Sequence, residues 1–91
     1  MLKNYTGKFG VIVDSTDKTI AIISFILFNE TSTPRVATLF LKDVDGNIKS
    51  QIFETSLKSK ETLSFDTKLF LMPGDKITGD GATFTISGDE E

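Results

Sequence analysis

The sequence predicts an all-β protein, folded as a single antiparallel β-sandwich of the immunoglobulin-like or jelly-roll-like kind, with about seven or eight short strands. The first observation is that its apolar runs are short and rich in β-branched residues and Phe, which suit pleated sheets better than helices. The second is that groups of Gly, Pro, Asp and Asn break the chain about every 8–12 residues. The third is that no stretch keeps the ~3.6-residue apolar period of an amphipathic helix.

The longest apolar run, residues 19–29, is expected to form the central strand. Its apolar side chains occupy both alternating faces, whereas a strand buried on one face alone would alternate with polar residues. We therefore expect one face to lie in the core and the other to be covered by a neighbouring layer or subunit, with a bulge switching faces along so long a strand. The residues predicted to contribute to the core are Ile20, Ile22, Ile23, Phe25, Leu27, Leu39, Leu41, Phe84 and Ile86.

The elements on either side of this strand follow from turn signals. Residues 1–6 are polar and are expected to form an arm, followed by a strand at residues 8–13 and a turn at 14–18. After the central strand, residues 30–34 are expected to form a loop and residues 35–42 a strand. The stronger apolar face of the latter strand consists of Ala37, Leu39 and Leu41, and the opposite face of Val36, Thr38 and Phe40.

The clearest turn in the chain is DVDGN at residues 43–47, because Asp-Gly before a new strand is a strong hairpin signal. Gly46 is expected there at positive φ, which glycine adopts without a Cβ penalty. The remaining elements are expected in this order: an edge strand at residues 48–55, a loop at 56–60, short strands at 61–66 and 69–72, a Pro-Gly turn at 73–74, a turn at 79–81, a strand at 82–87 and an acidic tail at 88–91.

Length and composition limit the kinds of function. The 91 residues are expected to form one small domain, for which oligomerisation is a common source of extra burial. A net charge of −3 and scattered basic residues argue against nucleic-acid binding, which needs clustered Lys and Arg. The chain has no Cys, His or Trp, so thiol nucleophiles, zinc–thiolate sites and the usual general base are excluded. We expect no enzyme activity, no cofactor, no signal peptide and no membrane association.

The acidic residues have simple explanations in turns. DVDGN superficially resembles a calcium loop, but it lacks the closing Glu and flanking helices of an EF-hand, so the hairpin turn is preferred. Capping of the backbone also explains the other loop acids better than a catalytic pair of carboxylates does. These acids are Asp14, Asp17, Asp66, Asp75 and Asp80, of which Asp75 is expected to stabilise the turn after Pro73-Gly74. No catalytic or metal-ligating residue is predicted.

Four aromatic residues are the candidate interface residues: Tyr5, Phe9, Phe40 and Phe70. Aromatic side chains concentrate binding energy at protein contacts. An equally supported alternative is that Phe9 packs in the core while Tyr5 is partly exposed in the arm. Phe40 and Phe70 lie on the less regular faces of their strands, where they either close a second layer or cover a partner.

The order of strand and turn signals between Lys18 and Gly88 resembles that of small β-sandwich proteins of tailed-bacteriophage virions. The matching parts are DKTIAIISFILFNETS, RVATLFLKDVDGN, KETLSFDTKLFLMPGDKI and ATFTISGDE. Short structural proteins on phage heads, necks and tails carry a similar apolar run followed by Pro-Gly-Asp and Ile in the penultimate strand. The resemblance implies a structural role and includes no catalytic signature.

We therefore expect a capsid-decorating subunit, located in the virion and synthesised in the host cytoplasm. Its expected partners are the major capsid protein or tail proteins and further copies of itself, with a trimer preferred. A tail, neck or baseplate component is one alternative, and a carbohydrate-binding module for a host surface is another. The scarcity of Tyr and the lack of Trp count against the second.

Overall fold

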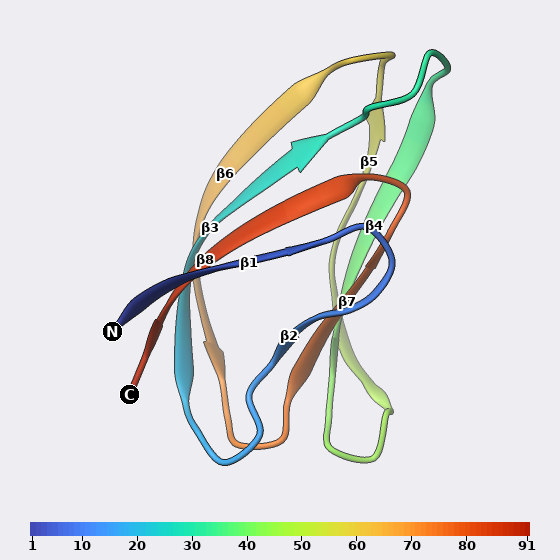
Figure 1. The fold of residues 1–91 in the computed structure, drawn as a ribbon. Helices are drawn as coiled ribbons and strands as arrows, with labels where there is room; N and C mark the ends of the chain where they lie inside the picture. Colours follow the sequence, from blue (N-terminus) through green and yellow to red (C-terminus); the bar gives the residue numbers. More distant parts are fainter.

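Eight β-strands in two sheets make up the protein, and the computed structural model describes all of residues 1–91 (Figure 1). Sheet A has the strand order β1-β8-β3-β6, and sheet B has the order β2-β7-β4-β5. The strands are β1 Leu2–Gly7, β2 Gly10–Asp14, β3 Ile20–Phe28, β4 Arg35–Lys42, β5 Ile48–Leu57, β6 Thr62–Leu71, β7 Lys76–Asp80 and β8 Thr83–Glu90. The sheets form the two layers of a sandwich, which confirms the predicted fold class. The structure contains no helix that could span a membrane.

The pairing of strands identifies this sandwich as a jelly roll. The chain pairs β1 with β8, β2 with β7, β3 with β6 and β4 with β5, all antiparallel. This nested pairing is that of one long hairpin, folded at the β4–β5 turn and rolled up, so that β3 also pairs with β8 and β4 with β7. Of the two sandwich types expected, the jelly-roll-like one is therefore observed.

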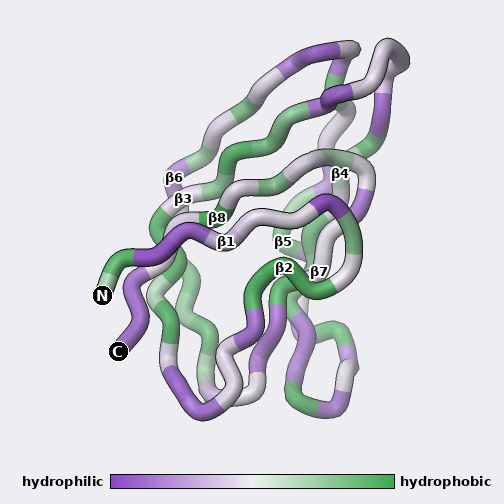
Figure 2. The backbone as a smooth tube through the Cα atoms, in the orientation of Figure 1, coloured by the Kyte–Doolittle hydropathy of each residue, from purple (hydrophilic) through white to green (hydrophobic).

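The core lies between the sheets and contains every predicted core residue except Ile23. β3 is an interior strand of sheet A, as predicted, and is hydrophobic along most of its length (Figure 2). Its register against β8 shifts between Ile22 and Ser24, so the predicted bulge lies at Ile23. The prediction for Ile23 is wrong because this extra residue points outward, 45% exposed, while Phe25 returns to the core.

Both chain ends belong to sheet A, which corrects the expected arm and tail. Residues 1–6 do not form an arm, because residues 2–7 are strand β1 and pair with β8 over their whole length. Residues 88–91 do not form a separate tail, because β8 continues to Glu90. The amino group of Met1 lies 2.8 Å from the Asp89 carboxylate, so the two termini are side by side (Figure 1). Deleting residues 1–6 would therefore uncover the edge of β8.

Other boundaries also differ from the expected ones. The strand expected at residues 8–13 begins at Gly10, because residues 8–9 form the turn between β1 and β2. The two short strands expected at 61–66 and 69–72 are one strand, β6, in which a register shift against β3 absorbs the break in the apolar pattern. β5 continues to Leu57, which shortens the loop expected at 56–60.

The β4–β5 hairpin turn has the predicted chemistry. The Gly46 N–H donates to the Asp43 carbonyl at 3.0 Å, and Gly46 has a φ of 87°. The Asp43 carboxylate accepts hydrogen bonds from the N–H groups of Asp45 and Asn47 at 2.9 and 3.0 Å. The acid at the start of this loop therefore caps the turn, and the positive φ predicted for Gly46 is confirmed.

Gly46→Val is expected to lower the free energy of unfolding by about 1–2 kcal/mol. A Cβ on Gly46 would have nothing within 4 Å, so the cost comes from the left-handed backbone alone. Thermal melting followed by circular dichroism measures this loss of stability. Gly46→Asn should lower the melting temperature less than Gly46→Val does, because Asn tolerates positive φ. An unchanged melting temperature for the valine variant would contradict the expectation.

The second predicted turn, after β6, is held by hydrogen bonds to Ser15 and Lys49. The Asp75 N–H donates to the Met72 carbonyl at 2.9 Å, and Gly74 has a φ of 93°. The buried Asp75 carboxylate accepts from the Met72 N–H at 3.0 Å and from Lys49 Nζ at 3.1 Å. The Ser15 hydroxyl lies 2.7 Å from the carbonyl oxygens of Met72 and Asp75. The role predicted for Asp75 is thereby confirmed.

Candidate functional site

The outer face of sheet B combines exposed apolar side chains with ordered charges. Residues opposite one another in paired strands share a face, so the strand registers define rows that run across the sheet. The acidic row contains Asp80, Thr38 and Glu54. The middle row contains Val11, Thr78, Phe40 and Gln51. The basic row contains Asp14, Lys76, Lys42 and Ile48.

Two of the four candidate interface residues come together on this face. Phe40 is half-buried in the middle row, and Phe9 is 78% exposed in the turn before β2. Both line a shallow hollow of about 340 Å³ that crosses β2, β7 and β4. The alternative in which Phe9 packs in the core is wrong, because the β1–β2 turn carries its ring out of the sandwich.

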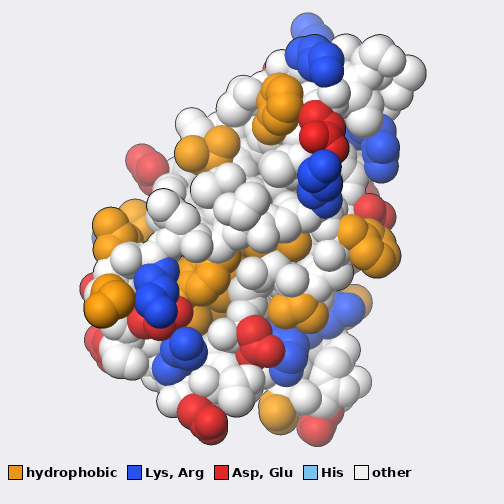
Figure 3. Space-filling view, viewed as in Figure 1, with side chains coloured by type: hydrophobic (Ala, Val, Ile, Leu, Met, Phe, Trp, Pro, Cys, Tyr) orange, Lys and Arg blue, Asp and Glu red, His pale blue; other side chains and the backbone are white.

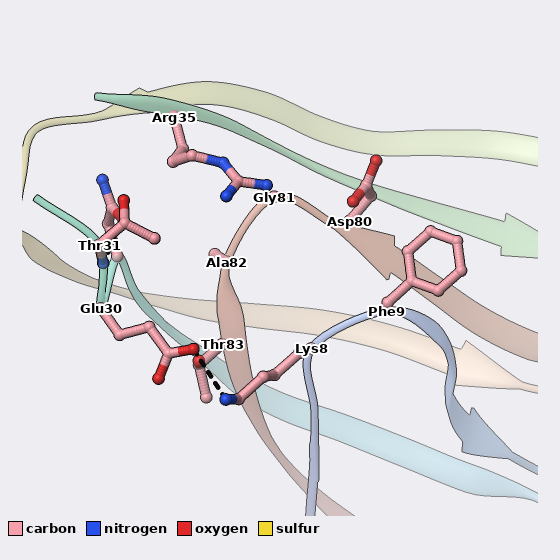
Figure 4. A pocket seen from close by; sticks show the side chains of 10 residues that line it. Lys8, Phe9, Glu30, Thr31, Arg35, Asp80, Gly81, Ala82 and Thr83 are labelled. Carbon is pink, nitrogen blue, oxygen red and sulfur yellow. Dashed lines mark hydrogen bonds and ion pairs between the residues drawn. The ribbon is translucent and has the colours of Figure 1, made fainter. Parts of the chain in front are cut away.

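A second hollow, at the loop end of the sandwich, shares Phe9 with the first (Figure 4). It measures about 320 Å³ and is lined mainly by polar and charged side chains. The lining comes from the β1–β2 turn, the loop after β3 and the β7–β8 turn. In Figure 4, the Arg35 guanidinium and the Asp80 carboxylate lie on either side of Gly81. This arrangement offers an aromatic ring, a cation and an anion to a polar ligand.

Only one ion pair forms within this loop-end hollow. Lys8 Nζ lies 2.7 Å from Glu30 Oε1, and the hydrogen bond from Lys8 holds the pKa of Glu30 below its ordinary value. Arg35 and Asp80 make no ion pair with any side chain of the chain. Their charges are therefore available to a bound group.

The buried side chain of Asn29 fixes the loop that forms one wall of this hollow. Its amide nitrogen donates to the carbonyl oxygens of Thr33 at 2.8 Å and Lys58 at 3.0 Å. Its amide oxygen accepts from the N–H and the hydroxyl of Thr31 at 3.0 and 2.6 Å. All of its hydrogen-bonding groups are occupied, so the wall is formed before any ligand binds.

Tyr5, the third candidate interface residue, belongs to the inner side of sheet A. It packs against the core, and its hydroxyl donates to Glu90 Oε2. Burial, together with the neighbouring Glu90 carboxylate, raises the pKa of Tyr5 above its ordinary value. Lys3 and Lys18 place their ammonium groups 3.3 and 3.4 Å from Glu90 Oε1. Tyr5 therefore joins strand β1 to the C-terminal end of β8, and its side chain is partly exposed.

This cluster predicts an acid-dependent part of the stability. The hydrogen bond from Tyr5, with those from Lys3 and Lys18, holds the pKa of Glu90 below its ordinary value of 4.5. Because the folded pKa is the lower one, the ionised carboxylate stabilises the fold above about pH 4.5, and this contribution is lost as the pH falls further. Glu90→Gln should therefore lower the melting temperature at pH 7, with a difference from the wild type that shrinks towards about pH 3.

Glu91→Gln is the control for this titration, because Glu91 forms no ion pair. It should leave the melting temperature nearly unchanged at each pH. If the difference in melting temperature between Glu90→Gln and the wild type stays constant with pH, the ionisation of Glu90 does not contribute to stability and the prediction is wrong.

Phe70, the fourth candidate, lies on the outer face of sheet A, on the opposite side of the sandwich from Phe40. It is 64% exposed and pairs in register with Ala21. Ile23 and Ile26 of β3 are also exposed, and a hollow of about 370 Å³ lies between Ile23 and Phe70. On the face seen in Figure 3, hydrophobic side chains form several small groups among charged ones. The structure therefore divides the four candidates among separate surfaces.

The acidic side chains do not gather into a centre. No group of three or more Asp or Glu side chains lies close enough to hold a metal ion. Asp14 accepts hydrogen bonds from the N–H and hydroxyl of Thr16, which is the backbone capping expected for it. These hydrogen bonds hold the pKa of Asp14 below its ordinary value.

Sequence reasoning missed the charged rows of sheet B. Within residues 35–42, the face opposite the core already carried apolar Val36 and Phe40, which is a signal of a surface that is not purely solvated. The charges that flank this face lie on β5, β7 and β4. Their alignment depends on strand register, which a single sequence does not reveal.

Comparison with known proteins adds no family to this description. No protein-family model matches the chain, and no curated protein matches it. The fold is similar to a chain in the structure of the infectious bursal disease virus Gx strain, with 12% sequence identity and a TM-score of 0.35. The match covers 100% of this chain and 30% of the viral chain. At this TM-score the likeness supports no inference about function or partners.

Proposed function

We propose that the protein is a non-enzymatic structural subunit that works through protein–protein contacts, as a capsid-decorating protein of a tailed-bacteriophage virion. The observation that carries this proposal is that both sheets leave apolar side chains exposed on their outer faces. These side chains include Val11 and Val36 on sheet B, with Phe9 in the adjoining β1–β2 turn, and Ile26 and Phe70 on sheet A. Exposed apolar groups on two opposite faces allow contact with two neighbours, and exposed apolar surface rimmed by polar residues is typical of interaction sites.

The resemblance of the strand and turn signals to phage virion proteins supplies the particular setting. The mild net negative charge of −3 fits the outside of a shell or tube better than contact with the genome. The partners would be the major capsid protein, or tail proteins if the subunit is a tail, neck or baseplate component. The jelly-roll fold alone does not decide among these roles, since one fold serves many functions.

The test is the amount of protein on purified particles, measured by mass spectrometry. Full-length protein should be present at a fixed copy number per particle. The double variant Ile26→Ser/Phe70→Ser should reduce binding about tenfold or more, which corresponds to about 1.4 kcal/mol. Val44→Ser is the matched control, because Val44 is 67% exposed but lies in the β4–β5 turn. Absence of the full-length protein from particles would contradict the proposal.

A second candidate function is the binding of carbohydrate on a host surface, and the loop-end hollow favours it. There the exposed ring of Phe9 lines the same pocket as Arg35 and Asp80, and ligand sites combine apolar surface with a few polar or charged groups. A glycan array probed with the wild type and with Phe9→Ala tests it. An array without hits removes this candidate and leaves the structural role unaffected.

A further inference from the structure

The charges on the outer face of sheet B are separated along the strands. The middle row, with Phe40 and Val11, lies between the acidic row and the basic row. The acidic row carries two exposed carboxylates, Asp80 and Glu54. The basic row carries Lys42 and Lys76, and the ionised Asp14 lies beside Lys76 at its edge, so the row keeps a net positive charge of one. This face therefore has an apolar centre with opposite charges at its two ends.

Such a face is complementary to itself in one of two symmetric arrangements. If two copies stack face to face about a two-fold axis parallel to the strands, the acidic row lies over the partner's acidic row. If the axis runs across the strands along the middle row, the strands become antiparallel, and the acidic row of each copy lies over the basic row of the other. Like charges brought together cost free energy, so only the second arrangement suits the charges.

We propose that the outer face of sheet B binds a second copy of this chain about a two-fold axis that runs across the strands. Phe40 then packs on its symmetry mate at the centre. Asp80 faces Lys76 of the other copy, Glu54 faces the neighbourhood of Lys42, and the symmetry repeats each contact. Packed sheets lie about 10 Å apart with their strands rotated by about 30°, a separation that Lys and Asp side chains bridge.

The size of the face indicates a weak, concentration-dependent dimer. The strands β2, β7, β4 and β5 have 5, 5, 8 and 10 residues. With strands about 4.8 Å apart and a rise of about 3.3 Å per residue, this face covers on the order of 400 Å² per copy. Stable interfaces bury about 800 Å² per partner, so the association is expected in the micromolar range or weaker. A two-fold pair of this kind differs from the trimer expected from the sequence, and it does not depend on the virion role.

Sedimentation velocity from about 10 µM to about 1 mM tests the proposal on the full chain. The wild type should pass from monomer to dimer, and added salt should weaken the dimer because it screens the charge pairs. Asp80→Lys and Lys76→Glu should each raise the dissociation constant about tenfold or more, since like charges then face each other. An equimolar mixture of these two variants should form a heterodimer, because opposite charges face each other again.

Matched controls on sheet A separate this effect from general charge changes. Asp66→Lys and Lys68→Glu make the same charge reversals on β6, and they should leave the dissociation constant unchanged. Circular dichroism melting confirms that each variant is folded. A monomer over the whole concentration range, a trimer, or a mixture of Asp80→Lys and Lys76→Glu that stays monomeric would overturn the proposal.

Discussion

Replacing Gly81 with alanine is expected to lower the free energy of unfolding by about 3–5 kcal/mol, because backbone strain and a steric clash add together. Gly81 has a φ of 90°, and a Cβ placed on it would lie 1.9 Å from the Val36 carbonyl oxygen. That oxygen belongs to the backbone of β4, so no side-chain rotation relieves the clash. The turn would have to move away from β4 and would widen the loop-end hollow that it lines (Figure 4).

Gly10→Ala is the control for this prediction. Gly10 has a φ of 80°, close to that of Gly81, but a Cβ on Gly10 meets nothing within 4 Å. Gly10→Ala should therefore lower the free energy of unfolding only through the strain of the left-handed backbone, by about 1–2 kcal/mol. Urea denaturation followed by circular dichroism measures both variants. Equal losses in the two variants would show that the contact with Val36 does not constrain the turn.

Phe84→Ala is expected to cost about 3–5 kcal/mol, because it removes a fully buried ring from the centre of the core. Phe84 lies between Gly7 of β1 and Leu27 of β3 in register. Its ring also covers Gly79 on the opposite sheet, where a Cβ would approach it to 2.7 Å. The side chain thus joins the two layers where glycine leaves room for it, and its loss leaves a cavity bordered by both sheets.

Phe70→Ala makes the same chemical change at a position that is 64% exposed. It should cost less than about 1 kcal/mol, because little surface leaves the core. Because both variants replace Phe with Ala, the difference between their urea midpoints reports the effect of burial alone. A loss for Phe84→Ala that is no larger than that for Phe70→Ala would contradict the position of the core.

The sequence predicted elements that depend on nearby residues. The alternation of Ala37, Leu39 and Leu41 identified the buried face of β4, and the Asp-Gly pair located the hairpin with Gly46 at positive φ. These signals are local, because side chains two apart share a face of a strand and a turn is set by its own few residues. In residues 19–29, apolar side chains occupy both alternating faces of the expected strand. This pattern likewise predicted an interior strand with a bulge.

The candidate site was predicted only in part. The direction in which a side chain points and its exposed fraction depend on strands that are distant in the sequence. Phe40 and Phe70 were recognised as lying away from the main core pattern, and both lie on outer faces. Tyr5 was grouped with Phe9 by proximity in the chain, yet the β1–β2 turn sends one ring inward and the other into solvent. Nothing within residues 1–10 distinguishes these outcomes.

What the sequence determined by itself is therefore an all-β sandwich, its turns and most of its buried side chains. Tertiary structure alone decided the jelly-roll order, the role of residues 2–7 as a strand and the alignment of charges across sheet B. Polar residues 2–7 carry no apolar alternation of their own. They become a strand because the edge of β8, more than 75 positions away in the chain, offers them unpaired backbone hydrogen-bonding groups. The rows of Asp80 with Glu54 and of Lys76 with Lys42 exist only once β5, β4 and β7 are paired in register, and strand register is a property of the assembled sheet.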